Sequence, residues 1–126
     1  MILVDTCGWL EYLRESELAA SYEPYFQKKH ELLVPVVVQY ELFKWFSREQ
    51  GPEIAKIVMA CSYQGVVVPM TTEVALLAAE LSLQHKLAMA DAMILASAQS
   101  HHAELITSDA HFQGISGVRF LSKKTD

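Results

Sequence analysis

Short, uninterrupted apolar segments alternate along this chain with longer segments of helical periodicity, and this alternation constrains the fold most. The apolar segments cover residues 2–4, 32–34, 66–68, 105–107 and 118–121, and they are rich in Val, Ile and Leu. Such runs are too short for helices, and they lack the polar–apolar alternation of a half-exposed strand. They are typical of strands buried on both faces of a parallel sheet.

Helices are expected between these strands, over residues 8–14, 17–29, 36–48, 52–64, from Thr71 or Thr72 onward, and 90–102. Pro24 is expected to interrupt or begin the second of them, and Gly51-Pro52 separates the third from the fourth. Apolar spacing predicts three buried stripes: Val38, Leu42 and Trp45; Ile54, Ile57, Val58 and Cys61; and Val74, Leu77, Ala78 and Leu81.

The predicted fold is an α/β, three-layer α/β/α sandwich around a central, mainly parallel, five-stranded sheet. The 126 residues show no repeat or linker, so they form a single predicted domain, 1–126, that ends in a polar tail at 122–126. No signal-like or membrane-length apolar segment is visible, so we expect a cytoplasmic protein without membrane association.

Charge and cysteine content exclude two classes of protein. The formal net charge is −5, which excludes nucleic-acid binding through bulk positive charge. Nucleic acid stays possible as a substrate, because a bound metal ion reverses the local sign of charge. The two cysteines are too few for a disulfide framework and suit a reducing compartment.

Two aspartates follow predicted strands. Asp5 comes directly after the first strand, and Asp109 lies two residues after Thr107 at the end of the fourth. Parallel strands end at the same sheet edge, where ligands bind in such folds. Taken singly, each aspartate is equally typical of a helix cap or turn.

Two further acids, Glu41 and Asp91, lie among inward-facing apolar positions of predicted helices. A carboxylate there is costly unless it is paired or metal-bound. Lys44 could pair with Glu41, whereas no adjacent base serves Asp91. We therefore interpret both acids as functional.

The four acids could converge only through the fold, since 36, 50 and 18 positions separate them in order. Clustered carboxylates repel one another unless a cation intervenes, and hard oxygen ligands favour Mg²⁺ or Mn²⁺. Such ions suit phosphoryl chemistry with a metal-activated water.

Three segments resemble the signatures of PIN-domain proteins. They are residues 4–12 (VDTCGWLEY), 89–98 (MADAMILASA) and 105–112 (LITSDAHF), and Glu41 matches the acid of the family's early helix. Together, in this order and at these spacings, the motifs make the chain similar to VapC-type toxins from end to end. Cys7 departs from the family pattern, where Asn or Ser is commoner.

The resemblance implies a metal-dependent endoribonuclease that uses Mg²⁺ or Mn²⁺ and acts on RNA. It implies the following roles: catalytic acids Asp5, Glu41, Asp91 and Asp109; metal ligands Asp5, Asp91 and, less firmly, Asp109; Glu41 near the attacking water; and Thr6 and Thr107 as hydroxyls that orient the carboxylates. Relatives of this type form homodimers and are silenced by an antitoxin whose C-terminal segment lies across the active-site groove.

Other α/β proteins with acidic sites fit this sequence less well. A haloacid-dehalogenase-type phosphatase needs an acid at position 7, which is Cys, and a receiver-type switch needs an aspartate after the third strand, where 68–70 reads VPM. A flap-type DNA nuclease of the same fold normally has extra acids and helical DNA-binding elements, for which 126 residues leave little room. A non-catalytic PIN module that binds RNA or protein as a scaffold is the main alternative.

Several other side chains allow two interpretations. His111 could contact a phosphate or be purely structural, and the other four histidines suit helix ends. Four aromatic residues could stack on bases or belong to the core or a dimer interface: Trp9, Tyr12, Trp45 and Phe46. The lysine pairs at 28–29 and 123–124 suit a solvated surface.

Overall fold

A computed structural model describes residues 1–123 and contains one five-stranded sheet. The strand order is β3-β2-β1-β4-β5, and all four neighbouring pairs are parallel. The strands are β1 (Ile2–Val4), β2 (Leu32–Pro35), β3 (Val66–Val68), β4 (Glu104–Thr107) and β5 (Val118–Phe120). The predicted parallel sheet is confirmed, and β5 ends one residue earlier than expected.

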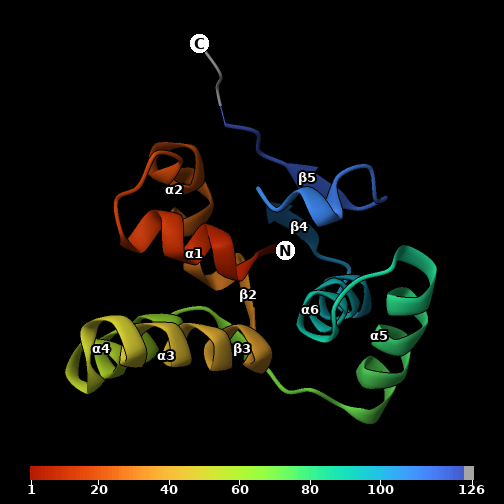
Figure 1. Cartoon of the computed structure of the whole chain (residues 1–126), viewed down its shortest axis with the longest axis horizontal. Coiled ribbons are helices and arrows are strands. Elements are labelled where there is room, and N and C mark those ends of the chain that lie inside the picture. Colours follow the sequence, from red (N-terminus) through yellow and green to blue (C-terminus); the bar gives the residue numbers. More distant parts are fainter. Residues whose placement is uncertain (124–126) are drawn as a thin grey trace.

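Six α-helices connect these strands: α1 (Thr6–Leu13), α2 (Ala19–Gln27), α3 (Val36–Gln50), α4 (Pro52–Ser62), α5 (Thr72–His85) and α6 (Met89–Ser100). Short 3-10 turns cover Lys29–Glu31 and Ala110–Phe112. Helices α1 to α4 lie on one side of the sheet and α5 and α6 on the other (Figure 1). This arrangement follows from right-handed crossovers, and it confirms the three-layer α/β/α sandwich.

The central strands form the core, as their apolar runs predict. The side chains of Leu3, Leu33, Leu105 and Ile106 are fully buried. The edge strand β3 is more open, and Val66 there is 38% exposed. Continuous apolar runs therefore occur where helices cover both faces of the sheet.

Two of the predicted helix faces were partly wrong. In α4 the buried residues are Ala55, Val58 and Ser62, whereas Ile54 and Ile57 are 38% and 59% exposed. The spacing of the larger side chains predicted a different side, and the buried Ser62 faces α3, where its Oγ accepts a 3.0 Å hydrogen bond from Gln39 Nε2. In α3 the third buried position is Phe46, and Trp45 is only partly buried.

Helix boundaries differ in smaller ways. Pro24 lies inside α2, which begins at Ala19, so it neither begins nor interrupts that helix. Thr71 is the cap of α5, where its Oγ1 accepts a 3.2 Å hydrogen bond from the Val74 amide. The end of the predicted polar tail, 124–126, lies outside the described residues. Within 1–123, no helix is both long and apolar enough to cross a membrane.

The strand order reverses between β1 and β4, which places a crevice at the carboxyl ends of these two strands. From β1 the chain proceeds to β2 and β3 on one side, and it returns to β4 and β5 on the other. In the parallel register Val4 pairs with Ile106, so that Asp5 and Thr107 are neighbours across the strands. Such a reversal is the usual ligand site in open α/β sheets.

Candidate active site

Asp5 is a buried carboxylate at the end of β1. It is 3% exposed and accepts three hydrogen bonds. The Thr6 amide donates to Oδ1 at 2.8 Å, and Thr107 Oγ1 and Cys7 Sγ donate to Oδ2 at 2.8 Å and 3.3 Å. Three donors hold the side chain in one orientation, with its carboxylate at the crevice floor.

Burial raises the pKa of Asp5 from 3.8 to about 6. The hydrogen bonds from Thr107 and Cys7 lower it, and the negative charge of Asp91 raises it again. Desolvation therefore outweighs three hydrogen bonds, because little water reaches this carboxylate. A nearby cation would reverse that balance.

Glu41 points toward α1 from the middle of α3. Its Oε1 accepts a 2.7 Å hydrogen bond from Thr6 Oγ1, across 35 positions of sequence. The pairing with Lys44 that the sequence suggested is wrong for the described residues 1–123, because no ion pair joins the two side chains. The partner of Glu41 is a hydroxyl, which holds the carboxylate without neutralising it.

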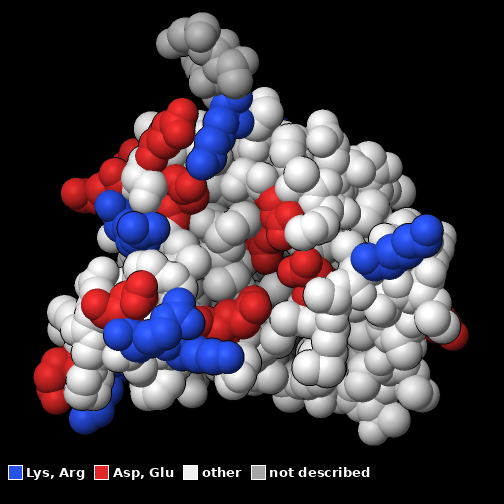
Figure 2. Space-filling model, viewed as in Figure 1, with Lys and Arg blue, Asp and Glu red and all other residues white. Residues whose placement is uncertain are grey.

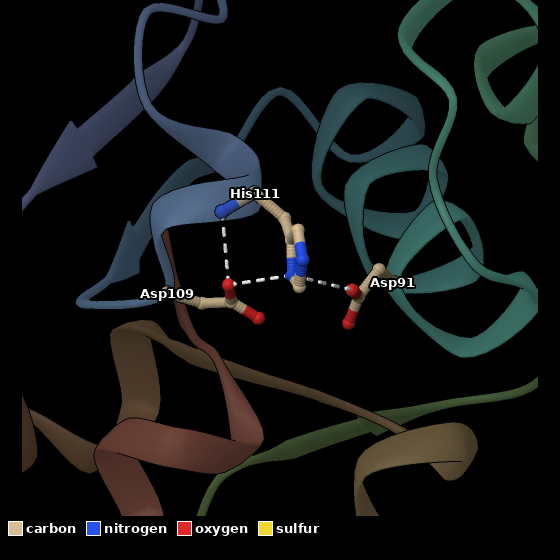
Figure 3. A group of neighbouring side chains, drawn as sticks. All are labelled: Asp91, Asp109 and His111. Atoms are coloured by element: carbon tan, nitrogen blue, oxygen red, sulfur yellow. Dashed lines mark hydrogen bonds and ion pairs between the residues drawn. The ribbon is translucent and has the colours of Figure 1, made fainter.

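Asp91 and Asp109 approach each other around the ring of His111 (Figure 3). His111 Nδ1 lies 2.9 Å from Asp109 Oδ1 and 3.9 Å from Asp91 Oδ2. The His111 amide also donates to Asp109 Oδ1 at 2.9 Å. One ligand atom from each of the three residues lies within 4.8 Å of the others. Sequence neighbours alone suggested no base for Asp91; the fold places His111 beside it.

The four acids act on one another electrostatically. The pKa of Asp91 is raised by burial first, and then by the negative charges of Asp109 and Glu41, while His111 lowers it. Asp91 in turn raises the pKa of Asp5. The structure therefore brings together all four predicted acids, from four separate segments, at the reversal of strand order. Figure 2 shows red acidic side chains gathered in the hollow at the centre of this face.

Thr107 and Thr6 are the hydroxyl neighbours of these acids. Thr107 Oγ1 accepts a 3.0 Å hydrogen bond from the Asp109 amide as well as donating to Asp5. Thr6 contributes its amide to Asp5 and its hydroxyl to Glu41. Each threonine thus connects two acids.

Three further polar residues, Cys7, Tyr22 and Ser108, form a network next to Asp5, and no sequence pattern indicated Tyr22 or Ser108. Cys7 Sγ lies 3.5 Å from Thr107 Oγ1 and 3.6 Å from Ser108 Oγ, and the buried Tyr22 donates to Ser108 Oγ at 2.8 Å. Burial, followed by the charge of Asp5, raises the pKa of the Cys7 thiol. Cys7 therefore serves as a neutral donor to Asp5.

Two of the candidate stacking residues are unavailable to a ligand. Trp9 and Phe46 are each 3% exposed and pack in the core, whereas Tyr12 and Trp45 are partly buried. Tyr12 stacks on Phe26 with ring centroids 4.3 Å apart. The core interpretation of these aromatic residues is thus the correct one for Trp9 and Phe46.

The site fits a divalent cation by the chemistry of its donors. Carboxylate oxygens of Asp91 and Asp109 converge with the imidazole nitrogen of His111, and Asp5, which lies outside this group of three, interacts electrostatically with Asp91. Carboxylates crowded in this way raise one another's pKa, which is the signature of uncompensated negative charge. Hard oxygen donors with one nitrogen suit Mg²⁺ or Mn²⁺.

Comparison with known proteins assigns the family. The PIN-domain family profile matches residues 2–118. No curated protein sequence matches the chain.

Solved structures match over almost the whole chain. A toxin–antitoxin complex from Klebsiella pneumoniae is 22% identical at a TM-score of 0.79, covering 94% of this chain and 96% of that one. VapBC2 from Rickettsia felis, bound to a DNA fragment from its promoter, is 14% identical at 0.76, covering 98% and 100%. VapC20 from Mycobacterium tuberculosis, a sarcin–ricin loop cleaving toxin, is 17% identical at 0.70, covering 82% and 85%. The chain belongs to the PIN-domain family, and it shares its fold with VapC-type toxins.

Proposed function

We propose that this PIN domain is a metal-dependent endoribonuclease, the toxin of a toxin–antitoxin pair. The observation that carries the proposal is the convergence of Asp5, Glu41, Asp91 and Asp109 on one hollow, where burial and neighbouring negative charge raise the pKa of Asp5 and of Asp91. Similar folds include a toxin described as cleaving the sarcin–ricin loop, an RNA, which supports RNA as the substrate class.

In this proposal Asp91 and Asp109 hold one Mg²⁺ or Mn²⁺ ion, and Asp5 adds negative charge from beneath. A bound ion supplies charge neutralisation at the phosphate and lowers the pKa of a water. Thr107 keeps Asp5 oriented through its hydrogen bond to Oδ2. Because the activated water is the nucleophile, the reaction needs no Ser, Cys or His nucleophile.

Glu41 has a separate task in this proposal. Thr6 Oγ1 donates a hydrogen bond to Oε1 of Glu41, so Oε2 is left to accept a hydrogen bond from the attacking water. The proton of that water can pass to the same oxygen as the new P–O bond forms, while the opposite P–O bond breaks and its leaving oxygen takes a proton from solvent. Thr6 therefore acts as a positioning residue that sets the direction of the Glu41 carboxylate.

The test is cleavage of a mixed RNA pool in Mn²⁺ or Mg²⁺ by the wild type and by Asp91→Asn. We expect cleavage by the wild type that falls to background in the variant and in chelator. Glu73→Gln, which removes an exposed acid of α5, is the matched control and should retain activity. Equal cleavage by Asp91→Asn would contradict the proposal, and metal binding without cleavage of any RNA would favour the non-catalytic scaffold.

The partners belong to the same proposal. Similar structures are toxin–antitoxin complexes, which supports an antitoxin as the partner of this chain. With that assignment we place the protein in the cytoplasm.

Leu76 and Leu83 of α5 are 64% and 85% exposed, and Met89 at the start of α6 is 72% exposed. Large exposed apolar side chains in one region mark interaction surfaces, and we assign this one to a homodimer. Leu83→Glu should convert a dimer into a monomer in light scattering, whereas a monomeric wild type would contradict the assignment.

A further inference from the structure

A hollow of about 250 Å³ extends the acidic site along α3. We call it the α3 groove. Its lining consists of Thr6, Leu10, Tyr40, Glu41, Lys44, Trp45 and Arg48. Two of these, Thr6 and Glu41, are the hydrogen-bonded pair of the acidic site. The groove is therefore continuous with the proposed centre of cleavage.

Helical spacing places the charged members of the groove in a row. Glu41, Lys44 and Arg48 follow one another at intervals of three and four residues, so their side chains lie on the same side of α3. From Glu41 to Arg48 the helix rises by roughly 10 Å. The row thus runs from an acid at the site to a cation near the end of α3.

The cations of the groove contrast with the charge of the whole chain, which is −5. Lys44 is exposed and makes no ion pair with any described residue; its Nζ lies 5.8 Å above the Tyr40 ring. Arg48 is also exposed, and its Nε lies 3.5 Å from Glu49 Oε2. Figure 2 shows blue side chains on this face beside the red acids of the central hollow. The groove therefore offers positive charge next to the site.

Tyr40 is the aromatic residue of the groove with most of its side chain exposed. It is 62% exposed, on the surface of α3 beside Lys44. Trp45 is occupied instead, with the Arg14 guanidinium 4.9 Å from its ring and Phe46 packed edge-on against it. An exposed tyrosine beside both an acidic residue and a cation suits a nucleobase next to a phosphate.

We propose that the α3 groove binds the single-stranded RNA segment next to the scissile phosphate. Lys44 and Arg48 contact successive phosphates, and the Tyr40 ring stacks on a base at the end of the groove that adjoins Glu41. The inference rests on the proposed nuclease function and adds the path of the substrate. An acidic peptide would also be attracted to the cations, but it would not use the exposed Tyr40 ring or need continuity with Glu41.

The experiment measures binding of a fluorescein-labelled single-stranded RNA of mixed sequence by anisotropy, in Mg²⁺, with all variants in an Asp91→Asn background. Lys44→Gln/Arg48→Gln should lower the affinity at least tenfold at low salt. The slope of log K against log salt concentration should fall by about 1.4, the value for two lost phosphate contacts on a single strand. Lys28→Gln/Lys56→Gln removes two exposed lysines elsewhere and should leave that slope unchanged.

Tyr40 is tested in the same assay. Tyr40→Ala should weaken binding about tenfold with an unchanged salt slope, because stacking involves no counterion release, and Tyr40→Phe should restore it. Equal melting temperatures across the variants exclude unfolding as the cause.

Several outcomes overturn the inference. The inference is wrong if the Asp91→Asn protein binds no RNA. It is also wrong if Lys44→Gln/Arg48→Gln and Lys28→Gln/Lys56→Gln give equal salt slopes. Loss of binding to a poly-glutamate peptide with RNA affinity intact would assign the groove to a protein partner instead. Failure of the nuclease proposal is recognised separately: the wild type would then cleave no RNA, while the salt slope still falls by the expected amount.

Discussion

Thr107 donates a 2.8 Å hydrogen bond to Oδ2 of Asp5, although 102 positions separate the two residues. The contact follows from the parallel register of β1 and β4, in which Val4 pairs with Ile106. The same Thr107 oxygen accepts from the Asp109 amide at 3.0 Å. One hydroxyl therefore fixes the acids that follow two different strands.

Replacing Thr107 by Val should expose this role, because valine keeps the branched shape and removes the hydroxyl. The hydrogen bond from Thr107 lowers the pKa of Asp5, so its loss should raise that pKa above about 6. The free energy of unfolding at pH 8 should fall by about 1–3 kcal/mol. Carboxyl ¹³C NMR titration and urea unfolding measure the two effects. Thr107→Ser should restore both, and an unchanged Asp5 pKa in Thr107→Val would contradict the assignment.

Burial of Asp5 predicts a pH dependence of stability in the metal-free protein. The pKa is 3.8 when unfolded and about 6 when folded, so between these values the folded state binds more protons. Stability should therefore be greatest below about pH 4 and fall as the pH rises through 6, by roughly 3 kcal/mol from this group. Urea unfolding from pH 4.5 to 8 in chelator measures it.

Asp5→Asn is the control for that pH dependence. The variant cannot ionise, so its stability should stay flatter over this range and exceed that of the wild type at pH 8. Adding Mn²⁺ at pH 8 should raise the melting temperature of the wild type more than that of the variant. A parallel pH dependence in both proteins would show that Asp5 is not its source.

His111 should influence the ionisation of Asp91. The imidazole lies 3.9 Å from Asp91 Oδ2 and lowers the pKa of that carboxyl, against the effects of burial, Asp109 and Glu41. His111→Ala should therefore raise the pKa of Asp91, which ¹³C NMR titration of the metal-free protein can follow. His30→Ala, at an exposed position in the turn before β2, should leave it unchanged. A lower Asp91 pKa in His111→Ala would contradict the electrostatic role.

Gly8 should not tolerate a side chain, although it lies within α1. A Cβ at this position would overlap the ring of Tyr22 and Val4 Cγ1. Helix propensity alone would make Gly8→Ala stabilising by up to about 1 kcal/mol. We expect destabilisation instead, since Tyr22 is fully buried and cannot move aside without losing its bond to Ser108. Thermal unfolding gives the sign, and a raised melting temperature would disprove the close approach.

The sequence by itself determined the fold class, and it singled out four acids as candidates for one site. Continuous apolar strands predict parallel strands covered on both faces, and an acid on an apolar stripe, as with Glu41 and Asp91, is costly without a function. Asp5 and Asp109 were predictable because both follow strands whose carboxyl ends share one edge. These inferences depend on the spacing of apolar and polar residues within single elements, which can be read from neighbouring positions in the sequence.

Only the tertiary structure decided which side chains meet. The order of the strands brings the Thr107 hydroxyl to Asp5. The packing of α1 against α3 brings Thr6 to Glu41, which the sequence had paired with Lys44. The turn after β4 brings His111 to Asp91. The buried face of α4, with Ala55, Val58 and Ser62, was likewise set by how the helix packs in the fold, not by its largest apolar side chains. Partners separated by up to about a hundred positions depend on packing and register, which no local pattern specifies.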